Sequence, residues 1–178
     1  MRILQSYIRS TDPSIHMISR SIAFVIGPYI DEASLDLLCL SKEDADELIR
    51  ALSSALCHPV LTTTSFSVSL SLEELITEID HSLIHPSNCS LLLDKGLLKS
   101  IPLLLKLRDN AETLNSTLIL LWHLSLHDVT KQSQLHMKSI KDNTAVIGEL
   151  RSSPPGDHNI LAKCIHLSLY PQDYTSKY

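Results

Sequence analysis

The chain has 178 residues, which is long enough for one domain with a sizeable core. Its 15 Lys and Arg residues against 20 Asp and Glu residues give a formal net charge of −5. This balance argues against a general nucleic-acid binder, because such a protein needs a basic face. Leucine is the commonest residue, whereas aromatic residues make up 4% and glycine occurs four times. This composition favours helix over strand and excludes a collagen, a disulfide-rich mini-scaffold and a disordered tail.

The cysteines and the apolar stretches predict the compartment in which the chain is found. The four cysteines are scattered without a Cys-x-x-Cys pair, so we expect buried, reduced thiols and no disulfide framework. No stretch approaches the roughly 20 apolar residues of a membrane span. The N-terminal residues lack an apolar run, so we expect no signal peptide. We therefore predict a soluble protein, cytoplasmic or nuclear, with no membrane or nucleic-acid partner and no cofactor.

The first clear helix begins after Ser41, which is a good N-cap before Lys42-Glu43-Asp44. Apolar residues follow at spacings of three and four, and His58-Pro59 should end the helix. The next segment, 61–70, is rich in Thr, Ser and Val and alternates like a strand. We prefer a polar loop for it, because no second strand is evident to pair with it.

Ser71 and Glu74 form the pattern of a capping box, which predicts a helix that stops before Pro86. A short helix over 87–94 and a left-handed turn or sharp corner at Gly96 should follow. Three further segments carry helical periodicity, and they are 97–107, 112–127 and a last helix capped by Asp157 that runs to about Leu169. Weaker helices are expected over 132–140 and 145–150. The segment 112–127 is apolar almost all round, so it should be buried on more than one side.

Short strings of residues recur at a common spacing. His123-Leu124-Ser125-Leu126 returns as His166-Leu167-Ser168-Leu169, 43 residues later. His81-Ser82-Leu83-Ile84-His85 resembles the first string from 42 residues upstream. Leu37-Leu38-Cys39-Leu40-Ser41 aligns with 121–125 at 84 residues, which is twice 42. Repeats of 40 to 47 residues with two or three helices each are typical of armadillo and HEAT solenoids.

Residues 88–107 resemble the first two helices of an armadillo repeat, with a short helix, the glycine corner at Gly96 and a second helix. The segment Leu120-Leu121-Trp122-His123-Leu124-Ser125-Leu126 is similar to the end of the family's third helix, where a Trp is common. The resemblance is clearest over residues 88–127. The family often carries an Asn four residues after this Trp, and Leu126 stands there instead, so clamping of an extended peptide by that Asn is not implied.

The resemblance implies an all-α, right-handed α-solenoid of about four armadillo-like or HEAT-like repeats. We expect one solenoid domain over 1–178, with an N-terminal cap at 1–40, units at 41–84, 85–127 and 128–170, and a tail at 171–178. In such a fold each repeat buries its apolar faces against its neighbours, and the third helices line a groove.

Two candidate stripes for protein binding follow from helical spacing. The first lies on the segment 112–127 and contains Asn115, Ile119, Trp122 and Leu126. Shifting it by 43 residues gives the second, which contains His158, Ala162, Ile165 and Leu169. These residues either line an apolar groove for a peptide or helix, or they are core contacts between repeats. Trp122 is the best candidate anchor, since Trp is enriched among binding hot spots.

Catalytic motifs are scarce in this chain. Glycine-rich phosphate loops and the Gly-x-Ser-x-Gly elbow are missing from the sequence. The pairs His81/His85 and His123/His127 are spaced to share a helix face and could each supply two metal ligands. A Glu beside the first His, as in zinc hydrolases, is missing.

We therefore expect a non-catalytic protein-interaction module or adaptor, with a protein or peptide partner. One alternative is a metal-binding helical protein or metal-dependent hydrolase that uses the His pairs. The other is a structural spacer or a fragment of a larger multidomain signalling protein.

Overall fold

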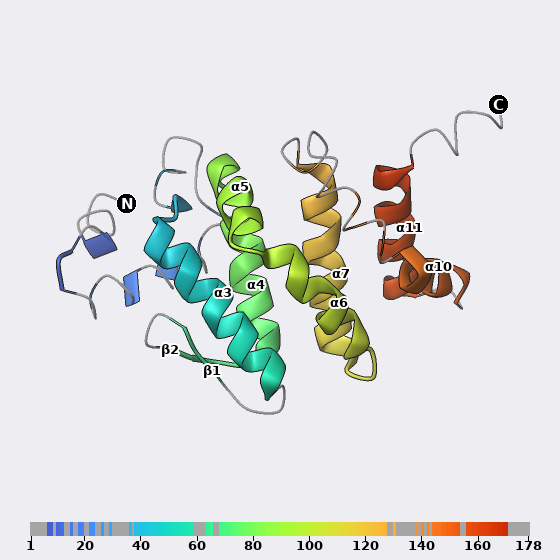
Figure 1. Ribbon diagram of the computed structural model, residues 1–178, viewed down its shortest axis with the longest axis horizontal. Helices are drawn as coiled ribbons and strands as arrows, with labels where there is room; N and C mark the ends of the chain where they lie inside the picture. Colours follow the sequence, from blue (N-terminus) through green and yellow to red (C-terminus); the bar gives the residue numbers. More distant parts are fainter. Residues whose placement is uncertain are drawn as a thin grey trace. The chain divides into compact units, whose positions relative to one another are not determined.

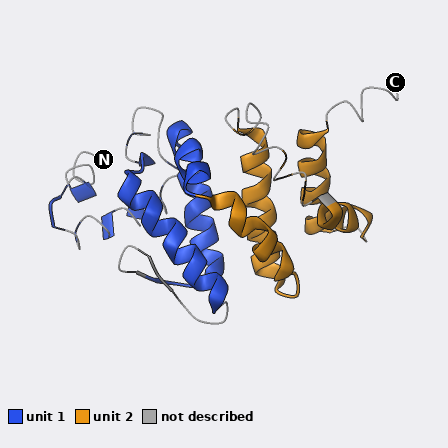
Figure 2. Ribbon diagram, viewed as in Figure 1, with its two compact units in different colours: residues 1–95 blue, residues 96–178 orange. Residues whose placement is uncertain are grey.

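The computed structural model describes residues 38–58, 63–65, 68–127, 144–153 and 156–170, together with residues 7–8, 10–12, 15, 18–19, 22–23, 26, 29, 36, 130, 138, 140 and 142. Over these residues the chain is mostly helical, as the composition predicts (Figure 1). Contacts divide it into two compact units, residues 1–95 and 96–178 (Figure 2). Within the described part, every helix is too short or too polar to cross a membrane.

Unit 1 is built around α3 (Lys42–Cys57). This helix packs against α4 (Leu72–Ser82), α5 (Pro86–Asp94) and strand β1 (Thr63–Ser65), and strand β2 (Val68–Leu70) lies against α4. The core contains the apolar faces of the three helices, including Leu48, Leu52, Leu75, Ile76, Ile79, Cys89 and Leu92. Apolar spacing in the sequence therefore predicts the buried faces of this unit correctly.

Capping boxes set where α3 and α4 begin, one at the predicted N-cap Ser41 and one at the predicted box of Ser71 and Glu74. The Ser41 hydroxyl accepts the Asp44 N–H at 3.1 Å, and the Asp44 carboxylate accepts the Ser41 N–H at 3.0 Å. Ser71 and Glu74 make the same reciprocal pair at 3.2 and 2.8 Å. Each box satisfies two donors that the first turn of a helix leaves without a backbone acceptor.

The expectation of a polar loop over 61–70 is wrong. Strands β1 and β2 form an antiparallel hairpin in which Thr63 pairs with Leu70, Thr64 with Ser69 and Ser65 with Val68. The segment needs no distant strand, because its two halves pair with each other. The hairpin packs on α3 and α4, and this support stabilises a two-stranded ribbon that would be marginal alone.

Unit 2 contains α6 (Leu97–Lys106), α7 (Ala111–Leu126), α10 (Thr144–Ser152) and α11 (Asp157–Leu169). α7 packs against α6 and α11, and α11 also packs against α10. As predicted, α7 is buried on more than one side, with Leu114, Leu118, Leu120, Leu121 and Leu124 in the core. Between α5 and α6, Gly96 has a φ of 95°, the left-handed conformation that the sequence predicts.

Two smaller expectations change in unit 2. Asp157 is the first residue of α11 and not its cap; Gly156 holds the cap position without a side-chain hydrogen bond. The helix expected over 132–140 falls mostly outside the described residues. The segment expected at 145–150 is helical and slightly longer, as α10.

Each unit joins two helices through a buried asparagine. Asn88 is the third residue of α5, and its Nδ2 donates to the carbonyl of Ser82, which ends α4, at 2.8 Å. Asn159 is the third residue of α11, and its Nδ2 donates to the carbonyls of Arg151 and Ser153 at 2.6 and 3.1 Å. These amides satisfy carbonyls at the end of the preceding helix, which has no further helical N–H to offer them.

Candidate functional site

The predicted stripe on α7 lies on the most accessible side of that helix. Asn115, Ile119 and Trp122 are half-buried, and the side chain of Leu126 is exposed. Most other residues of α7 are buried, and the exceptions are Ala111, Glu112, Ser116 and His123. We call Asn115, Ile119, Trp122 and Leu126 the α7 face.

Trp122 stands at the centre of the α7 face, and its ring stacks on that of the adjacent His123. The ring centroids are 5.4 Å apart, and the planes are inclined by 28°. This contact restrains the indole, and the residue as a whole is half-buried. A restrained aromatic side chain loses little conformational entropy on binding, which suits a binding anchor.

The predicted stripe on α11 lies on the opposite side of its helix from solvent. Ala162, Ile165 and Leu169 are buried, so the interpretation as core contacts holds for them and they cannot line a groove. His158 is half-buried, and its Nε2 lies 3.2 Å from the carbonyl of Ala111 at the start of α7. The 43-residue shift therefore carries the accessible face of α7 onto the packed face of α11.

The accessible apolar residues of α11 are Ile160 and Leu167, with half-buried Cys164 between them. These positions are spaced i, i+4 and i+7, so they share a face. The sequence predicted a different face of α11, because that prediction moved the stripe of 112–127 by a uniform 43 residues.

The histidine pairs do not share a helix face as expected. α4 ends at Ser82, so His81 and His85 belong to different elements, and His85 is the N-cap residue of α5. His127 follows the end of α7 with an extended backbone, φ −65° and ψ 135°. Within the described residues, no three His, Cys, Asp or Glu side chains converge as metal ligands.

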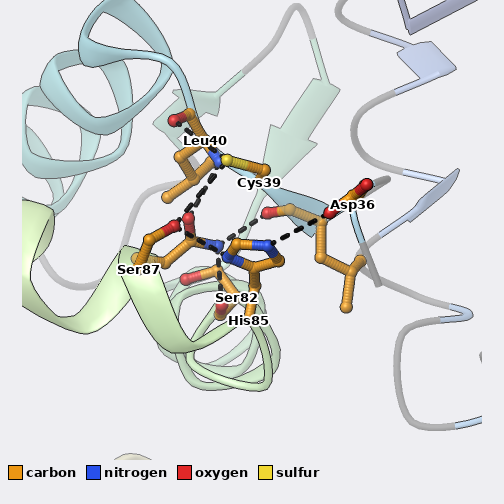
Figure 3. A network of polar contacts seen from close by, with 8 residues as sticks. Asp36, Cys39, Leu40, Ser82, His85 and Ser87 are labelled. Atoms are coloured by element: carbon orange, nitrogen blue, oxygen red, sulfur yellow. Dashed lines mark hydrogen bonds and ion pairs between the residues drawn. The ribbon is translucent and has the colours of Figure 1, made fainter. Parts of the chain in front are cut away.

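A network of polar contacts joins the start of α5 to the chain before α3 (Figure 3). At its base is the fully buried Asn88, whose Nδ2 donates to the carbonyl of Leu38 at 2.6 Å and whose Oδ1 accepts the N–H of Leu40 at 2.9 Å. The amide thus fixes the segment 38–40 against the first turn of α5.

Contacts drawn in Figure 3 join four further polar side chains, in the order Asp36, His85, Ser87 and Cys39. Asp36 Oδ1 lies 3.8 Å from His85 Nε2, and His85 Nδ1 is 2.8 Å from the hydroxyl of Ser87. Ser87 Oγ in turn is 3.7 Å from the sulfur of Cys39. The imidazole is 15% exposed, whereas the carboxylate of Asp36 is 90% exposed. We call Asp36, His85, Ser87 and Cys39 the thiol network.

The cysteines differ from the expectation of burial. Cys89 is buried and Cys164 half-buried, but Cys39 and Cys57 are exposed. All four lie in the described part of the chain, and none of them is in a disulfide. The thiol network was missed because its two segments, residues 36–39 and 85–87, are 46 to 51 positions apart, and no local motif relates Cys39 to His85.

Comparison of the chain with protein-family models, with curated proteins and with solved structures finds no match.

Proposed function

We propose that this chain is a non-catalytic protein-interaction module, which binds an apolar peptide or helix of a partner through the α7 face. The position of Trp122 carries the proposal. The single Trp of the chain lies on the accessible side of α7, in line with Ile119 and Leu126, although the same helix offers two buried sides. Trp at the centre of an apolar, partly exposed patch is the usual composition of a binding hot spot.

The proposal includes an architecture, a right-handed α-solenoid resembling armadillo repeats. It is supported by the order short helix, left-handed glycine, second helix and long third helix, which α5, Gly96, α6 and α7 follow. The recurrence at 42 and 43 residues in the sequence supports it further. Third helices of such repeats line the surface on which partners bind.

The chemistry of the α7 face defines the partner. The partner needs apolar side chains that contact Ile119, Trp122 and Leu126. At the other end of the face, Asn115 supplies one amide for a polar contact. The chain carries a net charge of −5, which disfavours acidic partners. The expected partner is therefore an amphipathic segment of neutral or basic charge, with apolar residues spaced to meet the stripe.

A photo-crosslinking residue placed at position 126, compared with one at position 167, identifies the partner. Both positions hold exposed leucines, with 45% and 42% of the residue accessible, but they lie on different helices. A specific partner should be captured from position 126 only. Capture of a second copy of this chain at 126 would instead make the α7 face a self-association surface and contradict the proposal.

Affinity for the purified partner then tests the face. Leu126→Ala should raise Kd about fivefold to tenfold, because it removes an apolar contact next to the anchor. Leu167→Ala removes the same atoms at nearly the same exposure and should leave Kd unchanged. Equal effects of the two variants would show general stickiness and contradict the proposal.

Trp122→Ala separates an anchor from a core residue. If Trp122 is an anchor, Trp122→Ala should raise Kd 30-fold or more, which is about 2 kcal/mol of binding free energy, while the protein remains folded. If the variant instead lowers the unfolding free energy by about 3–5 kcal/mol and leaves Kd unchanged, Trp122 is a core residue.

A further inference from the structure

The thiol network contains a nucleophile, a hydroxyl, an imidazole and a carboxylate in that order (Figure 3). Its three contacts measure 3.7 Å from Cys39 Sγ to Ser87 Oγ, 2.8 Å from Ser87 Oγ to His85 Nδ1 and 3.8 Å from His85 Nε2 to Asp36 Oδ1. The first two are hydrogen-bond distances for sulfur and for oxygen. A neutral His85 with its proton on Nε2, toward Asp36, leaves Nδ1 as an acceptor for the hydroxyl of Ser87.

We propose that Cys39 is a reactive thiol, which His85 deprotonates through Ser87, and that it is a site of oxidation by peroxides. The S–H proton passes to Ser87 Oγ while the Ser87 hydroxyl proton passes to His85 Nδ1. The products are a thiolate and an imidazolium, and Asp36 lies beside the new positive charge. The thiolate is the nucleophilic form of cysteine, so this transfer raises the reactivity of Cys39.

The same network supplies the proton that the oxidation step needs. The thiolate attacks one oxygen of hydrogen peroxide, so an S–O bond forms and the O–O bond breaks. The departing hydroxide takes the proton from His85 Nδ1 through Ser87 and leaves as water. Cys39 becomes a sulfenic acid, its sulfur being oxidised by two electrons and the peroxide reduced by two.

Cys39 and Cys57 lie at opposite ends of α3. Cys39 comes two residues before the N-cap Ser41. Cys57 is the last residue of the same helix. Both thiols are exposed, so accessibility alone does not distinguish them. Cys57 is therefore an internal control within every sample.

The buried Cys89 provides a second control. Its side chain is completely buried in unit 1, the unit that holds the thiol network. Its reaction with any reagent in water requires the unit to open. Protection of Cys89 therefore shows that a variant keeps its fold.

The test treats the full-length protein at neutral pH with limiting hydrogen peroxide, traps sulfenic acids with dimedone and quantifies each cysteine by mass spectrometry. Cys39 should be oxidised about tenfold faster than Cys57. Ser87→Ala interrupts the relay and should lower the Cys39 rate about tenfold, while the Cys57 rate stays the same. Ser87→Thr keeps the hydroxyl and should retain most of the rate.

His85→Gln removes the base at a separate position and should produce the same loss as Ser87→Ala. If Cys89 becomes reactive in Ser87→Ala, that variant has lost its fold, and His85→Gln then provides the test of the relay. Equal rates at Cys39 and Cys57 in the wild type would overturn the proposal, as would a Cys39 rate that His85→Gln leaves unchanged. The outcome does not depend on the α7 face, which belongs to unit 2.

Discussion

At the scale of single residues, two buried asparagines hydrogen-bond backbone groups that in many loops are bonded by water instead. The side chain of Asn88 is fully buried and makes three hydrogen bonds to backbone groups of residues 38, 40 and 82. The Nδ2 of Asn159 donates to three less deeply buried carbonyls, those of Leu150 and Arg151 in the last turn of α10 and that of Ser153 just after it. Both residues are six positions after a serine whose own hydroxyl donates to the carbonyl three residues before it.

Asn88→Ala should lower the free energy of unfolding by about 3 kcal/mol, because it leaves the N–H of Leu40 and the carbonyl of Leu38 without this partner, while the carbonyl of Ser82 keeps only the N–H of His85. Urea denaturation followed by circular dichroism measures the change. Asn159→Ala should cost less, about 1–2 kcal/mol, since water reaches its carbonyl acceptors. The control Ser54→Ala, on the exposed side of α3, should change stability by less than about 0.5 kcal/mol. A loss at Asn88 no larger than that of the control would contradict the role of this amide.

Two glycines should respond in opposite directions to the same substitution. Gly96 has a left-handed φ of 95°, so Gly96→Ala should destabilise the protein by about 1–2 kcal/mol even though space for a methyl group exists. Gly148 lies inside α10 with nothing near the position of its missing side chain. Gly148→Ala should therefore stabilise the protein by about 0.5–1 kcal/mol. Thermal melts of the two variants decide this, and a shift of both in the same direction would contradict the backbone argument.

The sequence predicts residues whose role is local. Ser41 and Ser71 act within three positions of themselves, and the role of Gly96 depends on its own φ. The roles of Asn88 and Cys39 depend on partners 48 to 50 positions away, so no local pattern announces them. Asp44 shows the intermediate case: it belongs to an acidic run typical of a solvated face, yet its capping role buries it.

At the scale of elements, the sequence predicts where the helices begin better than it predicts which of their faces are exposed. The helices α3, α4, α5, α6, α7, α10 and α11 all begin within one residue of their predicted starts, and caps and a glycine mark the starts of α3, α4 and α6. The hairpin was missed since its strands have three residues each, shorter than a strand pattern needs to be recognised. The face of α11 was assigned wrongly because apolar residues lie on both of its sides, and its sequence does not show which side α7 covers.

The capping box of α4 offers a test of an element boundary. Ser71→Ala should lower the free energy of unfolding by about 1 kcal/mol, because the N–H of Glu74 loses its acceptor. Ser71→Asp should restore most of the loss, since a carboxylate at the N-cap accepts the same bond. Urea denaturation measures both variants. Equal stabilities of wild type and Ser71→Ala would show that the box contributes nothing.

At the scale of the whole molecule, the sequence predicts an all-α chain, and the described residues are mostly helical with one short hairpin. The boundary between the two compact units falls between Lys95 and Gly96, inside the segment for which the sequence predicts an armadillo-like repeat. The division into four repeats depends on strings that recur at 42 and 43 residues. It stays a prediction, whereas the helices that such a repeat needs are present in the expected order over 86–126.

Function at this scale depends on whether the α7 face is a surface that a partner covers. The face belongs to α7, which packs against α6 and α11 within unit 2. The one Trp of the chain lies on it, which makes its fluorescence a specific reporter of this surface.

Acrylamide quenching of Trp122 emission, with and without the captured partner, tests the central proposal most directly. In the free protein we expect measurable quenching, because the indole is only half-buried. In the complex the quenching constant should fall several-fold and the emission should shift to the blue, as the partner replaces water around the ring. Leu167→Ala should give the same result as wild type. A quenching constant that is unchanged when the partner saturates the protein would contradict binding through the α7 face.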